Sequence, residues 1–115
     1  MAAVAGDKFS VGSGLWCISD TSGADLEEWA AEAAGTICEI VSIRVGNTLS
    51  TLSTFAVKDA AGNFLIQAEP VTLTKQVFVD YAPGIRPRLS GLTVDTPTFG
   101  ASCVVNYSII YRVVG

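Results

Sequence analysis

The chain contains 115 residues, a length that suits one domain with its own hydrophobic core. Its formal net charge is −4 and it has no cluster of Lys and Arg, so nucleic acid is not expected as a partner. Hydrophobic residues make up 50% of the chain and charged residues 16%, and no apolar run approaches the roughly 20 residues that cross a bilayer. We therefore expect no membrane partner, and an apolar surface that identical subunits or a larger partner covers.

Residues 1–14 are expected to form a flexible N-terminal arm or a short edge strand. They contain three glycines and few large apolar side chains, and chain ends of this composition are usually poorly ordered unless other elements hold them. The start of the chain also lacks the basic and apolar segments of a secretory signal. Residues 15–115 are expected to form a single domain, which begins with a short strand over 15–19 and a turn at 20–23.

Residues 25–34, with the sequence DLEEWAAEAA, give the one helical pattern of the chain. Their acidic first turn suits the positive end of a helix dipole, their alanines have high helix propensity, and Gly35 is a natural stop. Leu26 and Trp29 begin an apolar stripe at helical spacing. We therefore predict one short helix here, lying on the rest of the domain because ten residues are marginal as an isolated helix.

From residue 36 onward, apolar and polar residues alternate with the period of a β-strand. The expected strands occupy residues 36–45, 53–58, 64–67, 71–81, 89–94 and 101–114, with 71–81 divisible into two pieces. Residues 59–63 form the loop of a hairpin. About seven or eight strands at intervals of about ten residues predict a mainly β fold, an antiparallel β-sandwich of jelly-roll-like form, rather than alternating strands and helices.

The final stretch, residues 101–114, shows the clearest alternation. One face is apolar and aromatic throughout, and we expect it to lie in the core. That face carries Val105, Tyr107, Ile109 and Tyr111. The opposite face carries three further apolar residues, Val104, Ile110 and Val114. A strand that is apolar on both faces is covered on both faces, so we expect the second face to contact a neighbouring subunit.

No catalytic residue is expected, because the chain contains no His and its lysines do not stand beside a recognisable nucleophile. Cys17, Cys38 and Cys103 are widely spaced and form no CxxC pair, which predicts buried, reduced thiols rather than a zinc site. Asp59 and Asn63 are interpreted as turn residues rather than as ligands of Ca²⁺. The sequence thus predicts neither a metal nor a cofactor.

Seven residues are candidates for contact with a partner: Phe9, Val11, Trp16, Trp29, Val104, Ile110 and Val114. The two tryptophans combine a large apolar area with a polar N–H group, which is favoured at interfaces and on sugar-binding platforms. Trp29 shares its apolar stripe with core-type residues, so a core position suits it better. The residues next to Trp16 do not indicate whether its side chain faces the core or the surface.

The C-terminal half of the chain resembles a known family. The sequence PGI ends at Ile85, GLTV occupies residues 91–94, a polar loop contains Gly100 and Ala101, and the chain closes on NYSIIYRV and two further residues. Together with the hairpin FAVKDAAGNFLI, these motifs resemble the small β-rich head decoration or cement proteins of tailed bacteriophages. The predicted helix over residues 25–34 is not part of the resemblance.

The resemblance implies a non-enzymatic structural protein on the outside of a virion capsid, made in the host cytoplasm. Such a protein forms a homo-oligomer, most often a trimer, and bridges subunits of the major capsid protein, with an arm over residues 1–12 that orders on the shell. The alternative is a carbohydrate-binding or adhesin module of a phage tail or fibre, using Trp16 or Tyr81. A small β-sandwich enzyme is the third interpretation.

Overall fold

The computed structural model describes residues 7–22, 29–48, 52–96 and 104–115. These residues form eight strands: β1 (Asp7–Gly12), β2 (Leu15–Ser22), β3 (Trp29–Asn47), β4 (Ser53–Lys58), β5 (Phe64–Val71), β6 (Val77–Asp80), β7 (Arg88–Asp95) and β8 (Val105–Val113). Every pairing between them is antiparallel. The prediction of a mainly β, antiparallel fold is therefore confirmed.

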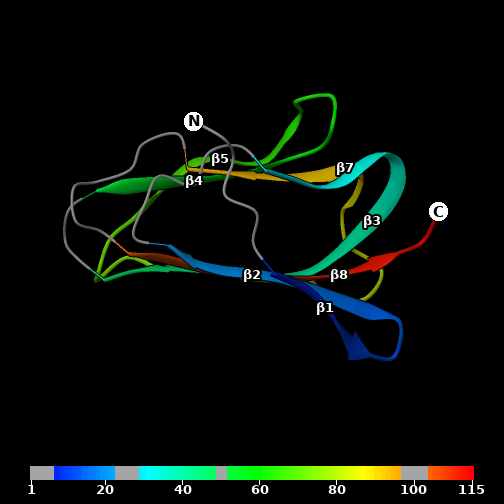
Figure 1. The fold of residues 1–115 in the computed structure, drawn as a ribbon, viewed down its shortest axis with the longest axis horizontal. Helices are drawn as coiled ribbons and strands as arrows, with labels where there is room; N and C mark the ends of the chain where they lie inside the picture. Colours follow the sequence, from blue (N-terminus) through cyan, green and yellow to red (C-terminus); the bar gives the residue numbers. More distant parts are fainter. Residues whose placement is uncertain (1–6, 23–28, 49–51, 97–103) are drawn as a thin grey trace.

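The strands are joined in the order β1-β2-β8-β3-β7-β4-β5, with β6 pairing β3 off this path. Figure 1 shows that the sheet folds into two layers, with β1, β2 and β8 in one and β4, β5 and β7 in the other. Strand β3 belongs to both, because residues 29–39 pair with β7 whereas residues 38–47 pair with β8 and residues 42–45 with β6. We call these the β8 layer and the β4 layer.

The core lies between the two layers. The predicted core face of β8 is confirmed, because Val105, Tyr107, Ile109 and Tyr111 are all at most 3% exposed. Opposite them, the β4 layer contributes Phe55, whose ring centroid lies 5.4 Å from that of Tyr107. Burial of these large apolar side chains supplies the main driving force for folding.

The predicted helix is wrong in the part that the structure describes. Residues 29–34 belong to β3, where Trp29 pairs with Val94 and Ala30 with Thr93, while residues 25–28 lie outside the described ranges. Helix propensity is a weak preference, and strand pairing with β7 overrides it here. Gly35 is not a helix stop: it has a φ of 92° and lies in the irregular stretch of β3 between Glu32 and Ile37.

Other boundaries differ less. The turn predicted at 20–23 gives way to strand through Ser22, and β8 begins at Val105, with residues 101–103 of the predicted strand outside the described ranges. The strand predicted over residues 71–81 is present only as β6, because Val71 is the last residue of β5, which extends beyond the predicted 64–67, and residues 72–76 are not in a strand. The jelly-roll form stays a prediction.

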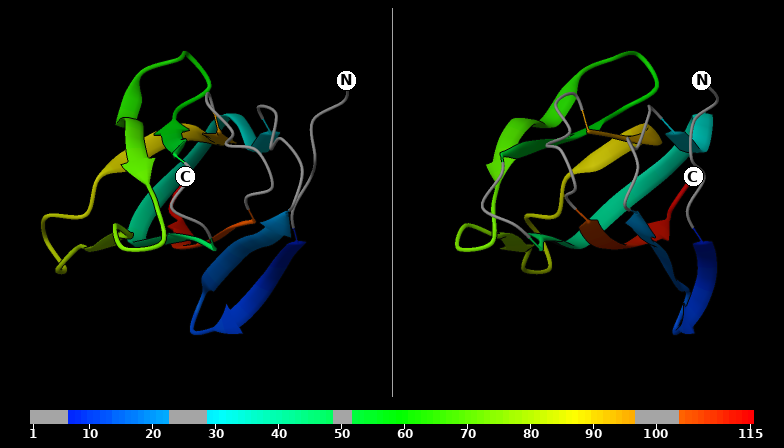
Figure 2. Two further views of the ribbon diagram at one scale, coloured as in Figure 1. Left: turned by 90° about the vertical axis from the view of Figure 1, so that its left-hand side faces the viewer. Right: turned by 60° about the vertical axis from the view of Figure 1, so that its left-hand side comes forward.

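The N-terminal segment contains β1, which pairs with β2, while residues 1–6 lie outside the described ranges. In Figure 2 the β1–β2 hairpin, at the edge of the β8 layer, projects beyond the rest of the molecule. All six residues of β1 are exposed, and in the part of the chain described here β1 pairs with β2 only. Within the same ranges there is no helix long and apolar enough to cross a membrane.

Candidate ligand-binding face

Strand pairing brings three side chains into one row on the outer face of the β8 layer. Arg44 of β3 pairs with Phe78 of β6 on one side and with Ser108 of β8 on the other. Directly paired residues in an antiparallel sheet project from the same face. This face is the outer one, because the neighbouring residues Val45 and Tyr107 are buried in the core.

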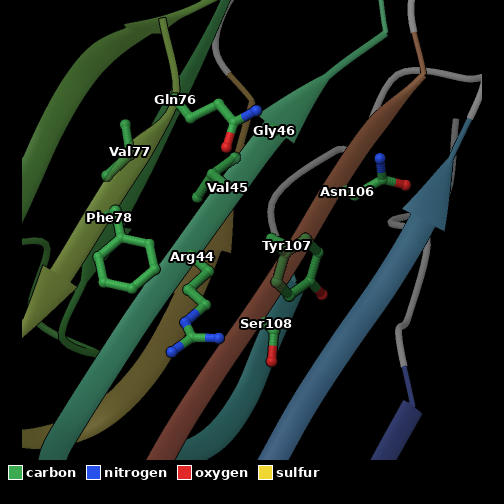
Figure 3. A pocket seen from close by; sticks show the side chains of 9 residues that line it. All are labelled: Arg44, Val45, Gly46, Gln76, Val77, Phe78, Asn106, Tyr107 and Ser108. Carbon is green, nitrogen blue, oxygen red and sulfur yellow. The ribbon is translucent and has the colours of Figure 1, made fainter.

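A hollow of about 380 Å³ lies over this row (Figure 3). It is lined by Arg44, Val45, Gly46, Gln76, Val77, Phe78, Asn106, Tyr107 and Ser108. Gly46 keeps it open, because a Cβ atom at that position would have only the Gln76 side chain near it, at 4.0 Å. The polar groups around the hollow are a guanidinium, two side-chain amides and a hydroxyl, all able to donate hydrogen bonds.

Phe78 supplies an apolar platform in this polar setting. Its side chain is 59% exposed, although phenylalanine is usually buried. The guanidinium carbon of Arg44 lies 4.5 Å from the ring centroid, a cation–π contact that steadies both side chains. The contact covers part of the ring and leaves the rest accessible.

A second hollow of about 270 Å³ lies beside the first. It is lined by Ile66, Glu69, Gln76, Val77, Phe78 and Val79. Three lining residues are common to both hollows, so Phe78 and Gln76 form the wall between them. A basic residue, Arg44, lines the first hollow, whereas an acidic residue, Glu69, lines the second.

A third hollow, of about 230 Å³, is lined by two arginines that both contact one glutamate. Arg88 Nη2 lies 3.2 Å from Glu39 Oε2, and Arg86 Nη1 lies 3.7 Å from Glu39 Oε1. The Arg86 Nε–H also donates to the carbonyl of Tyr81. These contacts tie the loop before β7 to β3, and both arginines share the single carboxylate of Glu39.

A polar cluster joins β1 to both layers. Glu32 Oε2 accepts a 2.6 Å hydrogen bond from the hydroxyl of Tyr111 and lies 2.7 Å from Lys8 Nζ, which stands 4.8 Å from the Trp16 ring centroid. Burial, together with this hydrogen bond and the nearby negative charge, raises the pKa of Tyr111 far above its ordinary value. Burial also raises the pKa of the Cys38 thiol to about 11, with help from the charge of Glu32. The cluster therefore has a structural role.

The predicted thiols and turn residues agree with the structure where it describes them. Cys17 and Cys38 are buried and form no disulfide, while Cys103 lies outside the described ranges. Asp59 Oδ1 accepts hydrogen bonds from the backbone N–H groups of Ala61 and Asn63, and its Oδ2 accepts one from the Asn63 side chain. These bonds lower the pKa of Asp59 and confirm its turn role. Among the described residues, no group of three His, Cys, Asp or Glu could hold a metal ion.

The seven predicted contact residues do not share one surface. Phe9 and Val11 are 46% and 45% exposed on β1, and Phe9 lies on the same face as Ile110, because both pair with Cys17. Trp16 is half-buried and projects from the opposite face, where it pairs with Tyr111. The other three lie apart: Trp29 half-buried in the β4 layer, Val104 half-buried before β8, and Val114 exposed after it.

Sequence reasoning missed the residues of the main hollow. One signal is present: alternation in residues 71–81 puts Val77 and Val79 on one face and Phe78, a large apolar residue, on the opposite one. Arg44 likewise stands among alternating apolar residues that face inward. Neither pattern shows that β6, β3 and β8 are neighbours, and that adjacency creates the site.

Comparison with known proteins gives only weak structural likeness. No family model and no curated protein matches the chain. Among solved structures, the chain is similar to the CBM22-1 xylan-binding domain of Xyn10C from Paenibacillus barcinonensis, with a TM-score of 0.42 and 17% identity over 98% of each chain. At that TM-score the comparison establishes neither a shared fold nor a shared ligand. The site is therefore interpreted from its own geometry.

Proposed function

We propose that the chain is a non-enzymatic carbohydrate-binding module that holds a glycan on the outer face of β6, β3 and β8. The observation that carries the proposal is the 59% exposed ring of Phe78 at the edge of an open polar hollow. A sugar offers an apolar C–H face that can lie on an aromatic ring, and hydroxyl groups that exchange hydrogen bonds with nearby side chains. Ligand sites commonly combine such an apolar surface with a few placed polar groups.

The polar groups of the hollow suit sugar hydroxyls. Gln76 and Asn106 each offer an amide that both donates and accepts, and Ser108 offers a hydroxyl. Gly46 leaves space between them, and the hollow continues past Phe78 into the second one. An open surface of this kind lets an oligosaccharide lie across the strands rather than enter end-on.

A glycan array followed by titration calorimetry on the best binder tests the proposal, with Phe78→Ala as the variant. Phe64→Ala is the matched control, because Phe64 is 48% exposed on β5 and has Lys58 Nζ 5.9 Å from its ring centroid. We expect Phe78→Ala to weaken binding about tenfold or more, equivalent to about 1.4 kcal/mol, and Phe64→Ala to change it less than about twofold. The glycan should be recovered uncleaved.

Either of two results contradicts this function. The first is an array on which the wild-type chain binds no glycan. The second is a glycan whose affinity is the same for the wild-type chain and for Phe78→Ala, since binding would then lie elsewhere on the molecule.

A second candidate function is favoured by β1. Phe9 and Val11 are exposed on an edge strand whose outer side pairs with no other described strand. Such an edge is a template for pairing with another chain, and its apolar side chains add contact area. This surface suits a virion decoration or cement protein, located on the capsid exterior, that forms a homo-oligomer and contacts the major capsid protein.

Light scattering of the free chain and co-sedimentation with capsid shells test this second function. We expect a stable oligomer that binds shells, and weaker binding by Phe9→Ser. A stable monomer with no affinity for shells contradicts it. Because Phe9 and Phe78 belong to different strands, the two substitutions separate the two functions.

A further inference from the structure

We propose that the hollow over β6, β3 and β8 selects a glycan that carries a carboxylate, such as a uronic or sialic acid residue, and that Arg44 binds this carboxylate. This inference rests on the proposed carbohydrate-binding function and specifies its ligand class. The charged residues near Phe78 and their present contacts support it.

Arg44 has hydrogen-bond donors that pair with no described carboxylate. The described ion pairs link Lys8 to Glu32, and Arg86 and Arg88 to Glu39. Within the described ranges, Arg44 has its contact with the Phe78 ring and no carboxylate partner. A guanidinium has five N–H donors, and contact with one ring does not occupy all of them. Those groups match a carboxylate in a two-point hydrogen-bonded pair.

The neighbours of Arg44 leave its charge locally dominant. The paired residues on either side, Phe78 and Ser108, are uncharged, and none of the residues lining this hollow is acidic. Asp80 lies on the same face two pairs further along β6, opposite Ser42, and the ion pairs between described residues do not include one between Asp80 and Arg44. The chain has a net charge of −4, but at physiological salt charges beyond about 8 Å are largely screened. An anionic group is therefore attracted into the hollow by the nearby cation.

The two hollows beside Phe78 differ in charge, because Arg44 lines the first and Glu69 lines the second. Glu69 lines the second hollow, which shares Phe78 with the first hollow but is not lined by Arg44, so a carboxylate placed beside Glu69 would be repelled. A sugar stacked on the Phe78 ring would then turn its acid group toward Arg44 and its hydroxyls toward Gln76 and Asn106. The asymmetry predicts that one charged position along the glycan matters more than total charge.

The test compares acidic oligosaccharides with their methyl esters, which keep the shape of the sugar and remove the charge. The probes are uronate and sialate tetrasaccharides in both forms, with a neutral oligosaccharide as reference. Arg44→Gln is the variant and Arg112→Gln the control, because Arg112 is also an exposed arginine, on β8, and does not line the hollow. Asp80→Asn is the second variant.

We expect the wild-type chain to bind at least one acid about tenfold more tightly than its ester. Arg44→Gln should abolish that preference while ester affinity stays within about twofold, and Arg112→Gln should retain it. Asp80→Asn should tighten acid binding severalfold, because it removes a nearby like charge, and should leave the ester unchanged. This last measurement decides the matter if Arg44→Gln fails to fold.

Three outcomes overturn the inference, and they differ in what they imply for carbohydrate binding. If acids, esters and neutral glycans bind equally and all depend on Phe78, the charge preference is wrong and carbohydrate binding stands. If acids bind more tightly but neither Arg44→Gln nor Asp80→Asn changes that, the anion is held elsewhere. If no glycan of any charge binds, the inference and the proposed function fall together.

Discussion

At the scale of single residues, the site depends on one position without a side chain. Gly46 pairs with Asn106 between the row of Arg44 and the end of the sheet. Its φ is not in the left-handed region, so backbone conformation does not require glycine here. A side chain at this position would meet only Gln76 and would therefore occupy the space of the hollow.

The first prediction concerns Gly46→Val. Valine suits a strand, so we expect the free energy of unfolding to change by less than about 1 kcal/mol. Its side chain would fill the floor of the hollow and weaken glycan binding about tenfold or more. Urea unfolding and titration calorimetry measure the two effects. Unchanged affinity would show that the ligand does not enter the hollow above Gly46.

The second prediction concerns pH and Cys38. The folded protein raises the pKa of this thiol from 9.0 to about 11, chiefly by burial. The neutral thiol is therefore the form that the fold favours. Its contribution to stability is complete below pH 9 and is lost as pH rises toward 11. In urea unfolding at pH 8, 9 and 10, Cys38→Ala should lose less stability with rising pH than the wild type. Parallel slopes would contradict burial of an ionisable thiol.

At the scale of elements, regular alternating strands were predicted correctly from the sequence, whereas the irregular first part of β3 was not. Residues 53–58 were assigned correctly, because Phe55 and Val57 alternate with polar neighbours and their burial sets the period. Residues 29–34 were not, because alanines and glutamates carry a helical preference and no inward alternation. Their strand conformation comes from β7, a partner about sixty residues away that local patterns do not reveal.

The third prediction concerns the contact of β7 with that irregular stretch. Gly91 has a φ of 82°, and a Cβ there would lie 2.8 Å from the Cβ of Ala60 and 3.2 Å from the carbonyl oxygen of Glu32. We expect Gly91→Ala to destabilise the protein by about 2–4 kcal/mol, from left-handed strain plus the steric clash. Gly62→Ala is the control, since Gly62 has a φ of 90° but open space, and should cost about 1 kcal/mol. If Gly91→Ala and Gly62→Ala lower the free energy of unfolding equally in urea, the segments around Gly91 can move apart to accommodate a Cβ atom.

The fourth prediction concerns the attachment of β1 to the layers. Lys8→Met keeps the stem of the side chain and removes the charge that neutralises Glu32. Lys8 is 36% exposed and Glu32 12%, so the pair is partly screened by solvent. We expect a loss of about 1 kcal/mol in unfolding free energy. Lys75→Met, which removes an exposed lysine outside that pair, should cost less. If both variants match the wild type, β1 is held by its strand pairing with β2 alone.

At the scale of the whole molecule, the candidate site arises from strand order. Arg44, Phe78 and Asn106 come from segments separated by about thirty residues each, and they meet because β6 and β8 lie on either side of β3. The alternation within each segment identifies the outward face but not the neighbouring strand. Strand order depends on loop connections and on the bend of β3, so the individual residues were open to prediction and their assembly was not.

The last prediction tests whether the two proposed surfaces act independently. Within the β8 layer the order is β1-β2-β8-β3-β6, so Phe9 and Phe78 lie on its opposite edges. At about 4.8 Å between strands, these edges are about 19 Å apart. Sites this distant that share no partner usually contribute additively. Phe9→Ser should therefore weaken self-association without changing glycan affinity, and Phe78→Ala should do the reverse. Light scattering and calorimetry on both single variants and the double variant measure this. If Phe78→Ala also dissociated the oligomer, the outer face of β6 would be an interface between copies, and glycan and subunit would compete for it.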